Sequence, residues 1–340
     1  MLGWIFPVQV QSKENVELAK IADNVYARIV TPDGDAVGNA GVVILSHSVL
    51  VFDTHFTPEA GQALLSEIRA LTPKPVLYVV NSHAHPDHTH GNQVFEGALL
   101  IGSTATRRDV LEVDLPSLNR SMGIAQSQVE NLRRDLSKET DMMQLQQMRE
   151  QIKDREDYIQ MMSRLKIKAP FVTVDDSLKI QDGKDEVRIL YLGKGHTDGD
   201  LVVFIPAQKI AFVGDLFFNE AIPNVQDASL LPWTTTLEQV LKLDADKFVP
   251  GHGAVGSRKD VEEFLGYFRE LQSLVKEAVD RGDTMEQVTK DLTVPPKFSS
   301  YRFQNFFPAN VQKMYTELKA LQISASPAAG SPKTKRSNAK

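Results

Sequence analysis

The segment Asn81-Ser82-His83-Ala84-His85-Pro86-Asp87-His88 is the most informative part of the chain. It places three histidines and one aspartate within six residues, directly after a β-branched apolar run. Buried imidazoles and carboxylates must be paired or metal-bound, so four together indicate a metal site rather than a packing feature. His83 and His85 lie two residues apart and can point the same way from an extended loop. Asp87 and His88 follow the bend at Pro86 and can serve a second ion beside the first.

Four other segments supply matching groups, each at or near the end of an apolar run. They are Val51-Phe52-Asp53, Leu192-Gly193-Lys194-Gly195-His196-Thr197, Phe212-Val213-Gly214-Asp215 and Val249-Pro250-Gly251-His252-Gly253. In the last three, a glycine stands beside the histidine or aspartate and lets the backbone approach a crowded site. These segments therefore extend the predicted metal site beyond the first one.

The composition limits the chemistry. The 340 residues are 42% hydrophobic and 24% charged, as in ordinary globular proteins, and they include no cysteine. Thiol catalysis and thiolate-bound zinc or iron–sulfur centres are therefore excluded. The compartment stays open, either cytoplasmic or, after removal of a signal peptide, periplasmic or secreted.

Charge and hydropathy also limit the classes of partner that the chain can bind. The net charge is −6, but residues 324–340 hold four basic and no acidic side chains, so the remaining body carries −10. An acidic body is a poor general nucleic-acid binder, and we expect no nucleic-acid partner. No run of about 20 apolar residues is present, so we expect no membrane span.

The chain divides into parts of different character. Short apolar runs alternate with helical patterns over 21–256, beginning with an expected strand at Ile21–Val30, and predict a layered α/β (four-layer α+β) domain. Within it, residues 116–166 are almost free of glycine and proline and show helical spacing in two blocks, which predicts an inserted helical hairpin. Residues 1–20 form an N-terminal arm, interpreted as a packed strand or the remnant of a signal peptide. A C-terminal helical segment (257–323) and a disordered basic tail (324–340) follow.

In their order, the five segments resemble those of the metallo-β-lactamase-fold hydrolase superfamily, from about Ile21 to Gly253. The resemblance implies an αβ/βα sandwich with a two-metal site along one edge. It implies three sets of residues: His83, His85 and His196 on the first metal, Asp87, His88 and His252 on the second, and Asp215 bridging both. Asp53 would hold the ligand loop from behind. Nitrogen and oxygen ligands suit two zinc ions, and also iron or manganese.

The resemblance further implies hydrolysis by a metal-bridging hydroxide, with Asp215 and Asp87 as catalytic residues. His85 stands where the flavodiiron branch has an acidic residue, which disfavours oxygen reduction. Asp215 excludes the β-lactamases that use a cysteine ligand, and the stretch after it lacks the glyoxalase II pattern. With His196-Thr197-Asp198-Gly199-Asp200-Leu201 followed by Gly214-Asp215-Leu216-Phe217, the sequence resembles a group whose bacterial members include generic and quinoprotein-relay-type zinc metallohydrolases. We therefore predict a small-molecule ester, lactone, thioester or amide as substrate. The alternatives are a nuclease or phosphodiesterase, and β-lactam hydrolysis as a secondary reaction.

The candidate pocket residues and the hairpin each allow more than one interpretation. His55, Phe217, Phe218 and Asn219 follow Asp53 or Asp215 closely enough to line a pocket, and a surface position is the alternative for His55. Trp233 is expected in the core. The hairpin is either a lid or the arm of a homodimer, and its amphipathic blocks favour the arm.

Overall fold

The computed structural model describes residues 18–30 and 36–325. The predicted N-terminal arm, apart from its last three residues, and the tail beyond residue 325 lie outside the described residues. Within the described parts, no helix combines the length and apolar character needed to cross a bilayer.

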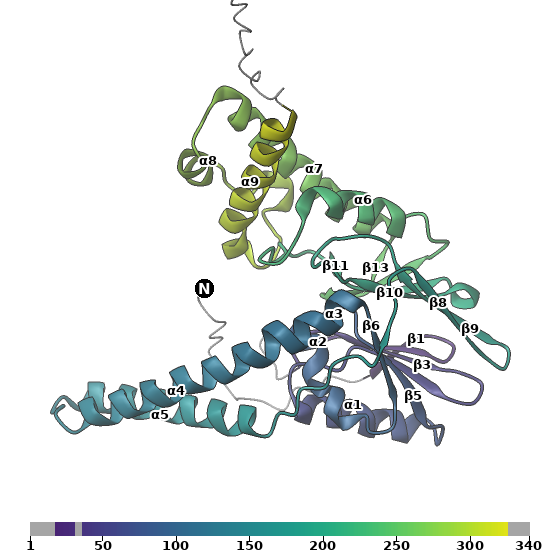
Figure 1. The fold of residues 1–340 in the computed structure, drawn as a ribbon, viewed down its shortest axis with the longest axis horizontal. Coiled ribbons are helices and arrows are strands. Elements are labelled where there is room, and N and C mark those ends of the chain that lie inside the picture. The colour runs from purple at the N-terminus through teal and green to yellow at the C-terminus, as the bar shows by residue number, and fades with distance from the viewer. Residues whose placement is uncertain (1–17, 31–35, 326–340) are drawn as a thin grey trace, which may run out of the picture.

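Two sheets form the centre of the molecule (Figure 1). The first sheet holds seven strands in chain order: β1 (Leu18–Ala22), β2 (Val25–Arg28), β3 (Ala40–Ile44), β4 (Val49–Phe52), β5 (Val76–Val80), β6 (Leu99–Gly102) and β7 (Val172–Thr173). The second holds six: β8 (Ser177–Asp182), β9 (Asp185–Tyr191), β10 (Leu201–Ile205), β11 (Ile210–Phe218), β12 (Lys247–His252) and β13 (Gly256–Ser257). Both sheets are mixed, because β4–β7 pair in parallel and so do β11 and β12.

The expectation of one strand over Ile21–Val30 is wrong. The chain turns at Asn24, which has a φ of 60°, and β1 and β2 pair as an antiparallel hairpin. Asparagine tolerates this left-handed conformation better than most residues, so the turn had a sequence signal.

The two sheets pack face to face. Phe52 and Val80 of the first sheet meet Val203 and Phe212 of the second in a shared buried cluster. A Cβ on Gly41 would lie 2.3 Å from the Phe212 ring, so only glycine lets the sheets close there. Strands β10 and β11 are buried along their whole length, which explains their unbroken apolar sequences.

Helices cover the outer face of each sheet. On the first, α1 (Pro58–Leu71) begins at Thr57, whose hydroxyl accepts a hydrogen bond from Ala60 N, and it buries Leu64 and Ile68. The second is covered by α6 (Leu230–Val240), α7 (Arg258–Arg281) and α9 (Phe307–Ala325), with α8 (Met285–Asp291) packed on α9. Short 3-10 turns occur at Pro206–Gln208, Pro296–Phe298 and Gln304–Phe306. The helix–sheet–sheet–helix order confirms the predicted α/β sandwich.

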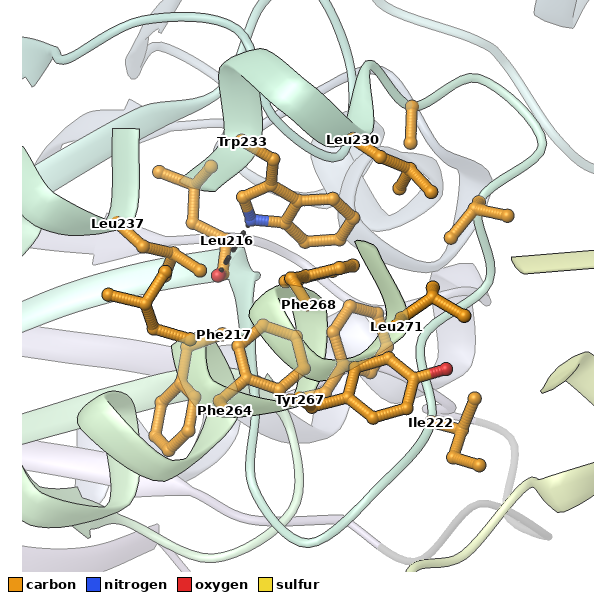
Figure 2. Close-up of a cluster of buried hydrophobic side chains, with 14 of the residues drawn as sticks. Leu216, Phe217, Ile222, Leu230, Trp233, Leu237, Phe264, Tyr267, Phe268 and Leu271 are labelled. Atoms are coloured by element: carbon orange, nitrogen blue, oxygen red, sulfur yellow. Dashed lines mark hydrogen bonds between the residues drawn. The ribbon is translucent and has the colours of Figure 1, made fainter. Parts of the chain in front are cut away.

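The C-terminal helices share one core with the second sheet. Figure 2 shows Trp233 of α6 packed on Phe264 and Phe268 of α7, with ring centroids 5.9 and 4.8 Å away. The Trp233 indole donates to Leu216 O on β11 at 3.1 Å. Trp233 is therefore fully buried in the core, as predicted.

The predicted hairpin is formed by α4 (Leu115–Leu136) and α5 (Met142–Ser163), which follow α3 (Thr104–Asp109) and one π-helical turn (Val110–Asp114). Asp141 caps α5 by accepting from Met143 N and Gln144 N. Figure 1 shows the hairpin extending away from the sheets. A lid could therefore involve only its base. Whether it forms a dimer arm stays a prediction.

Candidate metal centre

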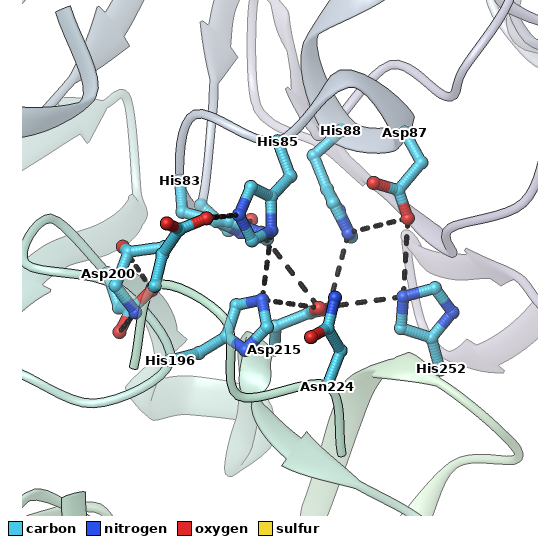
Figure 3. A network of polar contacts seen from close by, with 12 residues as sticks. His83, His85, Asp87, His88, His196, Asp200, Asp215, Asn224 and His252 are labelled. Atoms are coloured by element: carbon cyan, nitrogen blue, oxygen red, sulfur yellow. Dashed lines mark hydrogen bonds and ion pairs between the residues drawn. The ribbon is translucent and has the colours of Figure 1, made fainter. Parts of the chain in front are cut away.

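All seven residues that the resemblance assigned to metal binding lie together between the two sheets (Figure 3). His83 and His85 follow β5, and the short helix α2 (Pro86–Thr89) carries Asp87 and His88. From the second sheet come the other three: His196 in the β9–β10 loop, Asp215 on β11 and His252 at the end of β12. The site is thus built by strand ends and loops of both sheets.

The first group contains His83, His85, His196 and Asp215. His85 Nδ1 lies 2.9 Å from His83 Nε2 and 2.9 Å from His196 Nε2. Asp215 Oδ2 lies 3.1 Å from His196 Nε2. Three imidazole nitrogens and one carboxylate oxygen thus surround a common point, an arrangement that suits a four-coordinate zinc ion.

The second group contains Asp87, His88 and His252. Asp87 Oδ2 lies 3.3 Å from His88 Nε2 and 3.3 Å from His252 Nε2. Asp215 reaches this group too, with Oδ1 3.3 Å from His88 Nε2 and Oδ2 3.5 Å from His252 Nε2. Its carboxylate therefore touches both groups, as a bridging ligand must.

Two buried atoms show that metal ions fit here. Among the described residues, the buried side-chain atoms without a hydrogen-bond partner include His88 Nε2 and Asp215 Oδ1, which lie 3.3 Å apart as an ion pair. Buried polar atoms are rarely left unpaired, and each one that is calls for an explanation such as an ion. Both atoms are ligand atoms of the second group or its bridge, so a cation there would satisfy them.

The charge states also suit cation binding. Burial lowers the pKa of His196 to about 3 and that of His83 well below its usual value, so both imidazoles are neutral. Burial is the largest effect on Asp215 and opposes ionisation, but His252 and His88 outweigh it and hold the pKa of Asp215 well below its usual range. Neutral imidazoles beside ionised carboxylates are the forms that bind metals.

In the second group, the carboxylates favour positive charge on the neighbouring imidazoles. Burial is again the largest effect and lowers the pKa of His252, but Asp215 and Asp87 outweigh it and raise that pKa to about 9. The pKa of His88 is likewise raised well above its usual value, against the opposing effect of burial. The two carboxylates thus draw positive charge to this position.

Groups behind the histidines orient them. His88 Nδ1 lies 2.9 Å from Asp53 Oδ2, and Ser82 N donates to Asp53 Oδ1 at 2.7 Å. His85 Nε2 lies 3.0 Å from Asp227 Oδ2. A carboxylate that accepts one ring N–H leaves the other nitrogen free for a metal. Asp53 therefore has the supporting contacts that the sequence predicted.

Asp227 was not recognised in the sequence. It lies in the loop between β11 and α6, in the ordinary polar stretch Asn224-Val225-Gln226-Asp227. Its partner His85 is 142 positions away in the sequence. No local pattern distinguishes this aspartate from a solvated loop residue.

The four candidates for the pocket wall have different positions. Phe218 stacks on His252, with ring centroids 5.2 Å apart. Phe217 points instead into the core, against Phe264 (Figure 2). Asn219 N donates to His252 O at 3.1 Å and so supports the ligand loop. His55 is fully buried, so the surface alternative is wrong.

The cluster can be reached from solvent. The side chains of His85, Asp87 and His252 are 20%, 18% and 13% exposed, whereas those of His83 and His88 are fully buried. Substrate would therefore approach the centre from the side of these three partly exposed residues.

Comparisons with known proteins identify the family to which the chain belongs. A family model described as the Metallo-beta-lactamase superfamily matches residues 33–252, more than half of the chain. The linear primary-alkylsulfatase of Pseudomonas sp. (strain ATCC 19151) is 22% identical over 270 residues, which cover 74% of this chain and 49% of that protein. The metallo-beta-lactamase type 2 of Bacteroides fragilis is 23% identical over 278 residues, which cover 77% of this chain and 91% of that protein.

The chain thus spans about half the length of the alkylsulfatase. Among solved structures, a metallo-beta-lactamase from Pontibacter korlensis has a TM-score of 0.55 at 20% identity and covers 75% of this chain and 99% of its own, which supports the fold. On the strength of the family model, and in agreement with the fold and the site, the chain belongs to the metallo-beta-lactamase superfamily.

Proposed function

We propose that the chain is a dinuclear metal-dependent hydrolase that cleaves a small-molecule ester, lactone, thioester or amide. One observation carries the proposal: two groups of ligand side chains meet at Asp215, where His88 Nε2 and Asp215 Oδ1 are buried without a hydrogen-bond partner. Both relatives named above are hydrolases by their names. Two zinc ions are the proposed cofactors, and iron or manganese would suit the same ligands.

Two metal ions in this site would lower the pKa of a water molecule to near 7 and polarise the substrate's scissile group. The chain's own residues hold that arrangement in place. Asp215 joins the two groups, and Asp53 and Asp227 fix the orientation of His88 and His85. Asp87, whose side chain is 18% exposed, is the proposed residue for taking up a proton during turnover.

Several substrate classes can be ranked. The net charge of −10 outside the tail disfavours a nuclease or phosphodiesterase. A sulfate ester is a second candidate, because the alkylsulfatase aligns with 74% of this chain. A β-lactam is a candidate for a secondary reaction, given the similarity to the lactamase of Bacteroides fragilis.

Metal analysis combined with a substrate panel tests the proposal. The panel holds a carboxylic ester, a lactone, a thioester, an amide, a β-lactam, a phosphodiester and an alkyl sulfate. We expect two metal equivalents per chain and turnover of a member of the first four classes. His85→Ala and Asp215→Ala should lose metal and activity together. His47→Ala is the control, because this histidine is 77% exposed and pairs with Asp182 elsewhere. Full turnover by metal-free Asp215→Ala would refute the proposal.

A further inference from the structure

We infer that the segment Ala36–Asn39, which leads into β3 of the first sheet, completes the second metal group and so makes the centre dinuclear. All three residues of that group, Asp87, His88 and His252, are contacted or held by this segment or its immediate hydrogen-bond partners. The inference rests on the proposed function, and the experiment below separates the failure of one from the failure of the other.

Gly38 forms a wall of the second group. A Cβ at this position would lie 2.8 Å from Asp87 O and 3.0 Å from His88 Nε2, the atom that faces the second group. Real Cβ atoms rarely come so close to other heavy atoms. The missing side chain therefore keeps the space in front of His88 Nε2 open for an ion.

Asn39 holds the loop that carries His252. It is 2% exposed, and its side-chain amide donates to Pro250 O and Gly253 O, both at 2.9 Å. Its backbone N–H donates to Gly251 O at 2.8 Å. Three hydrogen bonds thus fix the main chain on both sides of His252 relative to the first sheet.

His55 holds the segment from the other side. Its Nδ1 donates to Gly38 O at 2.8 Å, and its Nε2 accepts from Arg28 Nη1 at 3.3 Å. Arg28 in turn pairs with Glu67 of α1 at 3.3 Å. His55 has a φ of 71°, a left-handed conformation that is uncommon for residues other than glycine. His55 is therefore a positioning residue for the Gly38 wall.

The first group does not depend on this segment in the same way. Within the described residues, no hydrogen bond joins Ala36–Asn39 to His83, His85 or His196. Disturbing the segment should therefore weaken binding of the second ion and leave the first ion bound.

The Gly38→Ala variant of the full chain tests this selectivity. Gly38 does not have a positive φ, so alanine is compatible with its φ angle, and the effect of the added methyl group comes from its contacts with Asp87 O and the His88 ring. Zn²⁺ stoichiometry is measured by elemental analysis, and the two affinities by calorimetric titration. We expect the stoichiometry to fall from two to one, with the first affinity unchanged. Gly266→Ala on α7 is the control, because a Cβ there meets nothing within 4 Å.

His55→Asn is the second variant, for the case that Gly38→Ala does not fold. Asparagine tolerates the positive φ but is too short to span Arg28 and Gly38. Loss of such a supporting bond should reduce the affinity for the second ion about 10- to 100-fold and leave the affinity for the first ion unchanged.

The outcomes are distinct. Binding of one ion by the unaltered chain overturns the dinuclear function, and with it the inference. Two ions with unaltered affinities in a folded Gly38→Ala variant, or in His55→Asn, overturn the role of the segment alone. If a folded variant binds both ions with equally reduced affinity, the segment does not act on the second ion alone.

Discussion

Replacing Asp53 with asparagine tests how the site sets the protonation of His88. Asp53 is 1% exposed, and its two oxygens accept from two different donors, Ser82 N at 2.7 Å and His88 Nδ1 at 2.9 Å. Asparagine has the same shape but offers one acceptor and one donor. It can therefore keep only one of the two hydrogen bonds.

The structure sets the expected size of the effect. An asparagine that keeps the bond to Ser82 turns its NH2 group toward His88 Nδ1, so the ring proton must move to Nε2. Nε2 is the atom that faces Asp87 and Asp215 at 3.3 Å. His88 is fully buried, so water cannot relieve the mismatch. A buried unsatisfied group costs about 1–3 kcal/mol, which corresponds to a loss of about 5- to 150-fold in second-ion affinity.

The assay is calorimetric titration of the chelated protein with Zn²⁺ in the presence of a competing chelator. Asp182→Asn is the matched control, because the Asp182 side chain is also largely buried, at 10% exposed, and pairs with a histidine outside both metal groups, His47 Nδ1 at 2.6 Å. The control should bind both ions as the unaltered chain does. If Asp53→Asn binds the second ion with unaltered affinity, the tautomer argument is wrong.

Four further predictions follow from the same geometry. Asp227→Ala should lower the affinity for the first ion by about tenfold, as measured by competition titration. This is the low end for residues that hydrogen-bond to a metal ligand, because the Asp227 side chain is 55% exposed and water can replace it. Gly251→Ala should abolish binding of both ions, because a Cβ there would lie 1.8 Å from Asp215 Oδ1, and elemental analysis that finds both ions retained would contradict it. Burial raises the pKa of Asp200 from 3.8 to about 7. The stability that this shift contributes to the folded state is fully present below about pH 4 and is lost as the pH rises to 7. Between pH 5 and pH 8, the unaltered protein without metal should therefore lose about 3 kcal/mol of unfolding free energy relative to the Asp200→Asn variant. Denaturant titration of the chelated proteins measures this difference. If the hairpin is a dimer arm, light scattering over a dilution series should show dimers, whereas a strict monomer at high concentration would discard the arm.

The elements with strong local patterns could be predicted. The two blocks of helical spacing in 116–166 match α4 and α5, because apolar residues at that spacing need a partner helix. The weak alternation over Ile21–Val30 predicts one strand where the structure has two, because the turn between them depends on a single residue, Asn24.

The neighbouring residues Phe217 and Phe218 show where local pattern stops being sufficient. Both rings contact Phe264 of α7, with ring centroids 5.8 and 6.1 Å away, but Phe218 alone of the two also stacks on His252. The folded structure alone shows which of these two core residues also reaches a ligand histidine.

Local sequence identifies the groups that could bind metal, because four potential ligands, His83, His85, Asp87 and His88, fall within six residues. It also placed the other groups at or near strand ends, where a sheet presents its side chains to a common edge. The residues that support these ligands can be identified only in the folded chain. Asp227, Asn39 and Gly38 act on segments that are distant in the chain, and each is an ordinary loop residue without a local signal. Their roles arise only when the two sheets meet face to face and the burial of apolar surface brings those loops within hydrogen-bonding distance.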